Sequence, residues 1–250
     1  MNKLPFILLL GFLGILRASF GQEKVILRIS SLEEEVDYIW QNIQDIQFFE
    51  EKGYQVVFPK LKYIDLLKEK SEDAELSSND YERLKSLFTD SIYKSVDYLA
   101  GLEKMKQNQS LIEKMIGMLG QLELDWNFKI HQPYVVKLTL YGPGGSYNPD
   151  TGHIVLFTTT EGGFKQYENP ACTIIHEIVH MGVEQSLIQK LRIPHTSKER
   201  IVDQFVLLNF QNLIPSYQLQ DMGDYRADAF MNSLDDLKDL DQKIKDALGE

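Results

Sequence analysis

The strongest constraint on the fold lies in residues 170–192, where two histidines and a glutamate interrupt an otherwise apolar helical pattern. Asn169 and Pro170 are typical of a helix start, as an N-cap followed by a first-turn proline. Apolar residues flank the polar ones (Cys172, Ile174, Ile175, Ile178 and Val179). A buried His-Glu-His cluster is costly to desolvate unless a partner satisfies it. The segment therefore predicts a buried helix that binds a metal ion; the alternative is a helix whose polar face is exposed.

Residues 176–180 read HEIVH, which is an HExxH motif. Histidines at positions i and i+4 share one helix face, so both imidazoles can reach one Zn²⁺ ion. The glutamate between them is placed to take a proton from a water molecule whose pKa zinc lowers to about 7. We therefore predict that His176 and His180 bind zinc and that Glu177 is the general base.

A catalytic zinc usually has three protein ligands, so one more is needed. Eighteen residues separate the motif from Glu199, which lies near the start of a predicted helix at residues 197–213. Asp203 follows one turn later and is predicted to accept a hydrogen bond from a zinc-binding histidine. Two alternatives for the third ligand are His195 and Glu184, and Glu199 is also placed to cap its own helix.

Two further residues bear on the chemistry. Tyr225, beside Arg226 at a predicted helix start, is a candidate for stabilising the oxyanion of the reaction, although ordinary packing also explains it. Cys172 is the only cysteine, so the chain forms no internal disulfide. Its position one turn before His176 predicts a small buried hydrophobic residue.

An HExxH motif, a glutamate eighteen residues further on and an acidic residue four positions later resemble the gluzincin branch of the zincin metallopeptidases. The resemblance covers roughly residues 134–210. It implies an α+β fold with a small, mostly antiparallel sheet whose edge strand lies over the active-site helix. Gly152–Thr158 is the predicted edge strand. The resemblance also implies Zn²⁺ as cofactor and a peptide or protein substrate that adds to this edge.

The remaining patterns divide the chain into a helical N-terminal portion (residues 22–130) and a zincin-like portion (residues 131–250), which together form one compact domain. Short β-branched runs predict two strands (residues 134–141 and 153–158) and a strand or extended segment at residues 54–58. Apolar residues at helical spacing predict the helices (residues 36–53, 61–70, 79–99, 111–122, 170–192, 197–213 and 224–248).

Residues 1–21 have the pattern of a secretory signal peptide. Lys3 precedes an apolar run over residues 4–16, and small and polar residues follow as far as Gly21. The run is shorter than the roughly 20 residues that a membrane-spanning helix needs. We predict cleavage after Gly21, or after Ser19, and a secreted or periplasmic mature chain without a membrane anchor.

The formal net charge of −11 argues against a general nucleic-acid-binding protein, which needs clustered Lys and Arg. The sequence therefore predicts an exported zinc metallopeptidase. Two alternatives stay open: a catalytically inactive zincin-fold module for binding or for the cell envelope, and a zinc hydrolase of non-peptide amides. The shared zinc chemistry does not separate a peptidase from the latter.

Overall fold

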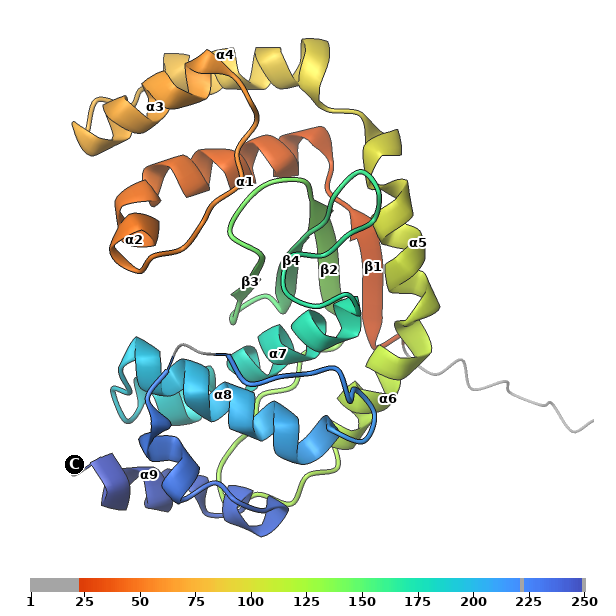
Figure 1. Cartoon of the computed structure of the whole chain (residues 1–250), viewed down its shortest axis with the longest axis vertical. Coiled ribbons are helices and arrows are strands. Elements are labelled where there is room, and N and C mark those ends of the chain that lie inside the picture. Colours follow the sequence, from red (N-terminus) through yellow and green to blue (C-terminus); the bar gives the residue numbers. More distant parts are fainter. Residues whose placement is uncertain (1–22, 221–222, 249–250) are drawn as a thin grey trace, which may run out of the picture.

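The computed structural model describes residues 23–220 and 223–248. The predicted signal peptide, residues 1–21, lies outside the described residues. Within the two described ranges, no helix is both long and apolar enough to cross a membrane. The predicted α+β class is confirmed, because helices surround a single four-stranded sheet (Figure 1).

The sheet contains β1 (Val25–Ile29), β2 (Tyr134–Thr139), β3 (Gly145–Asn148) and β4 (His153–Phe157), in the order β1-β2-β4-β3. β1 pairs with β2, and β2 with β4, in parallel; only β3 and β4 are antiparallel. The predicted mostly antiparallel sheet is therefore wrong. Parallel neighbours need long connections, and the helices between β1 and β2 supply one.

β3 forms one edge of the sheet, near the helices described below. The segment predicted to form this edge, Gly152–Thr158, does not. The predicted segment corresponds to β4, which lies between β2 and β3 and buries Ile154 and Leu156. β3 has the sequence GSYN and directly follows the turn residues 142–144, so it lacks the β-branched pattern of a strand. Tertiary pairing with β4, not local propensity, makes it a strand.

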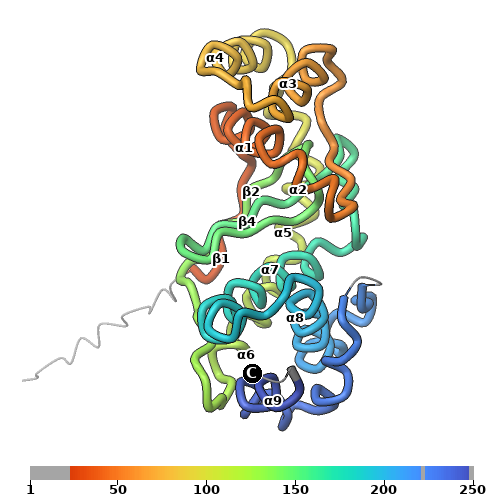
Figure 2. The backbone as a smooth tube through the Cα atoms, turned by 90° about the vertical axis from the view of Figure 1, so that its left-hand side faces the viewer, coloured from red at the N-terminus to blue at the C-terminus, as the bar shows by residue number. Residues whose placement is uncertain are grey.

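Two helices lie side by side beneath the sheet (Figures 1 and 2). α7 (Pro170–Val183) is buried along its whole length and packs against β3 and β4. α8 (His195–Phe210) packs against α7 on the side away from the sheet. α5 (Leu99–Gln107) and α6 (Gln109–Leu119) cover β1. The main hydrophobic core joins these helices to the sheet, so α7 has apolar neighbours on most sides.

Residues 31–92, here called the N-terminal lobe, have a second and smaller hydrophobic core. The lobe contains α1 (Leu32–Gln44), α2 (Ile46–Glu51), α3 (Lys62–Glu72) and α4 (Ser78–Leu87). Ser31 and Glu34 form a capping box at the start of α1, in agreement with the Ser-x-x-Glu spacing. Figure 1 shows the lobe above the sheet, on the side opposite α7 and α8.

Several predicted helices are interrupted. The helix predicted at residues 36–53 breaks at Asp45, which ends α1 and begins α2. The one predicted at residues 79–99 gives way to a π-helical turn at Phe88–Ile92 and a 3-10 turn at Ser95–Tyr98. The strand or extended segment predicted at residues 54–58 is not a strand and makes one isolated bridge, from Val57 to Gly142.

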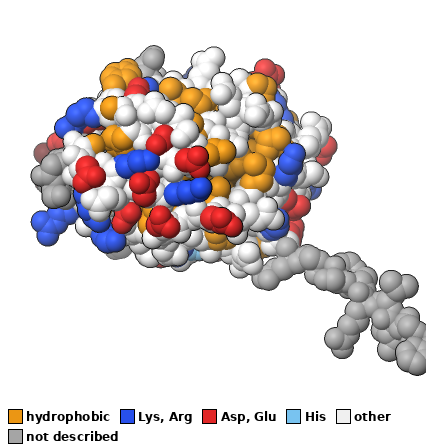
Figure 3. Space-filling view, turned by 90° about the horizontal axis from the view of Figure 1, so that it is seen from below, with side chains coloured by type: hydrophobic (Ala, Val, Ile, Leu, Met, Phe, Trp, Pro, Cys, Tyr) orange, Lys and Arg blue, Asp and Glu red, His pale blue; other side chains and the backbone are white. Residues whose placement is uncertain are grey.

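The predicted helix at residues 224–248 is also interrupted. It consists of 3-10 turns at Tyr225–Ala229 and Leu234–Leu237, followed by α9 (Leu240–Leu248). Ser233 and Asp236 form a capping box between these pieces, and this polar pair restarts the helix. The lower face of the molecule carries interspersed acidic and basic side chains (Figure 3), in keeping with the ion pairs that Lys243 makes with Asp236 and Asp239.

Candidate metal centre

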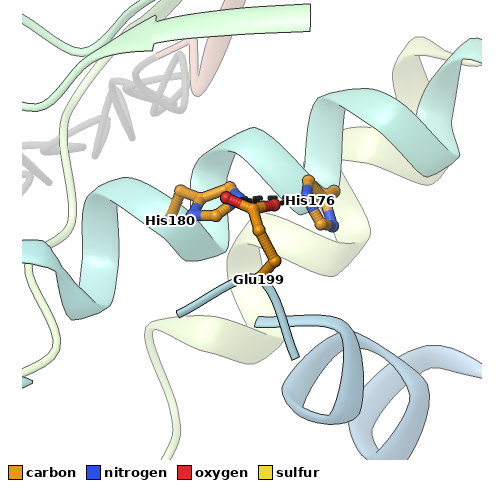
Figure 4. A group of neighbouring side chains, drawn as sticks. All are labelled: His176, His180 and Glu199. Carbon is orange, nitrogen blue, oxygen red and sulfur yellow. Dashed lines mark hydrogen bonds and ion pairs between the residues drawn. The ribbon is translucent and has the colours of Figure 1, made fainter. Parts of the chain in front are cut away.

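α7 presents the two motif histidines to α8. The Asn169 side chain accepts a hydrogen bond from the Ala171 amide, and Pro170 occupies the first turn, so α7 begins where the sequence predicted. His176 and His180 lie one turn apart on the same face of α7. Glu199 projects from the first turns of α8 toward both imidazoles (Figure 4).

The three side chains are spaced as the ligands of one small metal ion. His176 Nε2 and His180 Nε2 are 3.0 Å apart, and Glu199 Oε2 lies 3.7 Å and 3.3 Å from them. Tetrahedral bonds of about 2.0–2.1 Å place neighbouring ligand atoms about 3.3–3.4 Å apart. All three residues are buried, so an ion would satisfy polar groups that water reaches poorly. His176, His180 and Glu199 could therefore hold a metal ion.

Glu184, one of the two alternative third ligands, belongs to a different interaction. α7 ends at Val183, and Glu184 begins a π-helical segment at Glu184–Gln189. The Glu184 carboxylate accepts a hydrogen bond from the Tyr147 hydroxyl at 2.9 Å. The three-residue metal-binding cluster therefore contains Glu199 and not Glu184.

His195, the other alternative, lies behind Glu199 rather than beside the two motif histidines. Its Nδ1 atom is 3.6 Å from Glu199 Oε1, while the motif histidines face Glu199 Oε2. Its Nε2 atom is hydrogen-bonded to the Tyr54 hydroxyl at 2.9 Å. His195 thus contacts the carboxylate from the opposite side and links it to the N-terminal lobe.

A buried chain of hydrogen bonds orients His176. The Tyr217 hydroxyl donates to Asp203 Oδ1 at 2.6 Å and lies 2.7 Å from His176 Nδ1. Since the hydroxyl proton goes to Asp203, Nδ1 carries the imidazole proton and donates it to Tyr217. The lone pair of Nε2 then points at the metal-binding position, as a ligand requires. Asp203 also accepts from the Gln220 amide at 2.7 Å.

Asp203 thus lies behind His176, where the sequence placed it. Tyr217, which joins the two, was not predicted. It follows Pro215 and Ser216 in an irregular segment and belongs to no motif. Its proximity to His176 arises only because the chain folds back after α8.

Burial and the neighbouring charges shift the pKa values of the cluster residues in opposite directions. Burial disfavours a charged His176, but Asp203 and Glu199 raise its pKa to about 10, so a metal ion would have to displace the Nε2 proton in order to bind. Burial lowers the pKa of His180 to about 4, although Glu199 opposes this change. Burial alone would raise the pKa of Glu199, but the two histidines hold it well below its usual range. Glu199 is therefore a carboxylate that is ready to bind a cation.

Glu177 lies beside the cluster and under β3. Burial and the nearby Glu199 charge raise the pKa of Glu177 to about 7, with His176 opposing. A Cβ atom added at Gly145 would overlap Glu177 Oε1, so the β3 backbone directly covers the carboxyl group. Two residues along β3, the Tyr147 ring stacks on His180 with ring centroids 5.1 Å apart.

These groups open onto a cleft of about 770 Å³ between the N-terminal lobe and the α7–α8 pair. His176, Glu177, His180 and Glu199 lie on one wall. The opposite wall comes from α1, α2 and the segment that follows α2. From the sequence, the N-terminal helices are compatible with half of the cleft, an inhibitory lid or a partner surface; in the structure they line the cleft.

Tyr225 is not brought to this cleft. It lies in a 3-10 turn, its side chain is 60% exposed, and Arg200 lies over its ring at 4.7 Å. It does not belong to the described residues that line the cleft. Cys172 is fully buried in the core on α7, as the sequence predicted for a packing residue.

Comparison of the chain with known protein families, with curated proteins and with solved structures found no match. The α+β fold and the buried His-His-Glu cluster therefore define only a class: a globular chain with a candidate metal centre at the base of a cleft.

Proposed function

We propose that this protein is an exported zinc-dependent peptidase that hydrolyses peptide bonds in extended chains. One observation carries the proposal: the three candidate metal ligands and the unpaired carboxyl group of Glu177 meet in one cleft, directly beneath a strand edge. Metal, base and peptide-binding backbone are the parts that such hydrolysis needs.

The donor set favours a transition metal such as zinc, which is the ion that the HExxH spacing predicts. Two imidazole nitrogens and one carboxylate oxygen suit Zn²⁺, whereas Mg²⁺ and Ca²⁺ prefer oxygen alone. A bound Zn²⁺ would lower the pKa of a coordinated water toward 7 and polarise a substrate carbonyl. The Asp203–Tyr217 pair keeps His176 in the tautomer that leaves Nε2 free to bind.

Glu177 would act as the general base. Its carboxyl group faces the cleft, next to the ligand cluster, and its pKa of about 7 suits a general base at neutral pH. In the proposed reaction it takes a proton from the attacking water and later donates one to the leaving amine. Burial beneath Gly145 keeps the carboxyl group from turning away from the cluster.

β3 would bind the substrate backbone. The Phe157 amide donates to the Gly144 carbonyl at 2.7 Å, so Gly144 and, by alternation, Ser146 direct their backbone groups toward β4. Gly145 and Tyr147 then direct theirs toward the open edge. An extended peptide added there would pass over Glu177 and His180.

Metal content and peptide cleavage together test the proposal. We expect purified protein to contain one zinc per chain, and Glu199→Ala to lose it. Wild-type protein should cleave members of a mixed peptide library, and Glu177→Gln should keep the metal while losing cleavage. Glu103→Gln, which changes an exposed glutamate on α5, is the matched control.

Two results would overturn the proposal. If purified wild-type protein contains no stoichiometric zinc, the proposal loses its basis. Zinc-loaded protein that cleaves no peptide would favour the binding module, or a hydrolase of non-peptide amides if model amides of that kind were hydrolysed.

A further inference from the structure

The segment that follows α2 closes one end of the β3 edge. Residues 53–58, here called the strap, leave the end of α2 and lead toward α3. Val57 and Gly142 exchange two backbone hydrogen bonds, of 3.0 Å and 2.8 Å. This antiparallel bridge joins the strap to the chain three residues before Gly145.

Two side-chain contacts hold the strap in place. Lys165 Nζ donates to the Pro143 carbonyl at 2.6 Å and also to the Gln55 carbonyl, so it fastens the strap to the chain that enters β3. At the other end of the strap, the Tyr54 hydroxyl is hydrogen-bonded to His195 at the start of α8. The strap therefore contacts the sheet side of the cleft and also its helical floor.

The strap limits how far a bound peptide can extend. Along β3, Tyr147 covers His180 and Gly145 covers Glu177, so the scissile bond of a bound peptide lies next to these two residues. From Gly145 the edge runs only as far as the turn at residues 142–144, and Val57 pairs with Gly142 at the far end of this turn. Three residues span at most roughly 10 Å, which accommodates about one to three substrate residues.

Charge indicates which end of the peptide lies at the closed end. Lys165 has three N–H donors, and two of them serve the Gln55 and Pro143 carbonyls, which leaves one. Lys52, at the end of α2, also lines the cleft. The acid on this wall, Asp45, already accepts a hydrogen bond from Gln41 at 2.8 Å. Among the described residues, the third N–H donor of Lys165 has no acceptor, so a carboxylate at the closed end could bind there.

We propose that the protein removes short C-terminal fragments from peptides, with the substrate antiparallel to β3 and its terminal carboxylate bound by Lys165 at the strap. The antiparallel direction brings the C-terminus of a peptide to the Gly142 end, and antiparallel pairing is also slightly the more stable kind. This inference rests on the proposed peptidase function and specifies its substrate class.

The test compares one set of peptides with free and blocked ends, using zinc-loaded wild-type protein and mass spectrometry of the products. We expect release of one to three residues from the C-terminus. Amidation of the C-terminus should lower kcat/KM about tenfold or more, because a charged hydrogen bond is lost. Acetylation of the N-terminus should change kcat/KM by less than about twofold, since that end lies outside the closed part of the edge.

A lysine substitution tests the carboxylate contact itself. Lys165→Met should raise KM for free-acid peptides about tenfold and should reduce the difference between free and amidated peptides. Lys106→Met, which changes an exposed lysine of α5 outside the cleft, should leave both values unchanged.

The outcomes separate this inference from the function on which it rests. Cleavage inside long peptides, indifferent to amidation, would overturn the closed-end inference and leave the peptidase intact. Removal of N-terminal residues that acetylation blocks would reverse the proposed direction. Failure of zinc-loaded protein to cleave any peptide would overturn both.

Discussion

Two glutamates of this protein, Glu35 and Glu177, share one electrostatic property and differ in their surroundings. Burial is the main cause that raises the pKa of each carboxyl group to about 7. Glu35 lies on α1, where the N-terminal lobe meets the sheet, and is completely buried. Glu177 lies on α7 at the base of the cleft.

Glu35 and Glu177 differ in the hydrogen bonds that their carboxyl groups accept. Glu35 Oε1 accepts from the Tyr98 hydroxyl at 2.8 Å, the Thr139 hydroxyl at 3.0 Å and the Leu140 amide at 3.1 Å. No residue in the described ranges donates a hydrogen bond to the Glu177 carboxyl group. A raised pKa therefore does not identify a functional acid by itself. Access to a cleft, freedom from fixed partners and proximity to a ligand cluster distinguish the two carboxyl groups.

The sharpest test of this comparison exchanges each glutamate for glutamine. Glu177→Gln should lower kcat by about 10²- to 10⁴-fold, since a positioned general base contributes that much. Glu35→Gln should leave kcat within about twofold, because Glu35 lies outside the cleft. Steady-state kinetics on one peptide substrate, with circular dichroism to confirm folding, decides the matter. Equal losses in the two variants would contradict the distinction.

The second prediction concerns stability and follows from the raised pKa of Glu35. The pKa of Glu35 is raised from 4.5 to about 7 in the folded state, so the folded chain binds its proton more tightly than the unfolded chain. Its contribution is full below pH 4.5 and is lost as the pH rises through 7. The loss amounts to about 3 kcal/mol.

Glu35→Gln should therefore be more stable than wild type at pH 8, and the difference should shrink toward pH 5. Urea unfolding of both chains across this pH range measures it. A constant difference between the chains at every pH would refute the assignment to Glu35.

The third prediction concerns the hydrogen bonds behind His176. Tyr217→Phe removes the hydroxyl that joins His176 to Asp203, and should weaken zinc binding about 10- to 100-fold. Tyr167→Phe is the matched control, because Tyr167 stacks on Tyr217 but bonds the Gln218 carbonyl instead. Competition with a chromophoric chelator gives both affinities. Equal affinities for the two variants would show that Tyr217 only packs.

The smallest expected effect tests the strand that covers Glu177. Gly145→Ala places a methyl group against the Glu177 carboxyl and should lower kcat about tenfold through displacement of the base. Gly120→Ala, whose added methyl meets only ordinary contacts at 3.7 Å and 3.8 Å, should leave kcat unchanged. Zinc content should remain at one per chain in both, and a loss of metal from Gly145→Ala would assign its effect to the ligands instead.

Local patterns predicted much of the helical framework near the site. The N-cap at Asn169 and the strands at residues 134–141 and 153–158 correspond to observed elements. The predictions failed where a segment depends on a distant partner. β3 is a strand only because β4 pairs with it. The helix predicted at residues 224–248 fails for a local reason, since the Ser233–Asp236 capping box restarts the chain there.

The sequence by itself determined the candidate ligand pair and the candidate base, because His176, Glu177 and His180 share one helix and helical geometry sets their relative positions. The spacing from the HExxH motif also selected Glu199 as a candidate third ligand and Asp203 as a candidate hydrogen-bond partner of a ligand histidine. Only the tertiary structure decided between Glu199, His195 and Glu184, brought Tyr217 behind His176, and placed the N-terminal lobe opposite α7. These contacts join residues far apart in the chain, and long-range packing, which no local pattern encodes, holds them together.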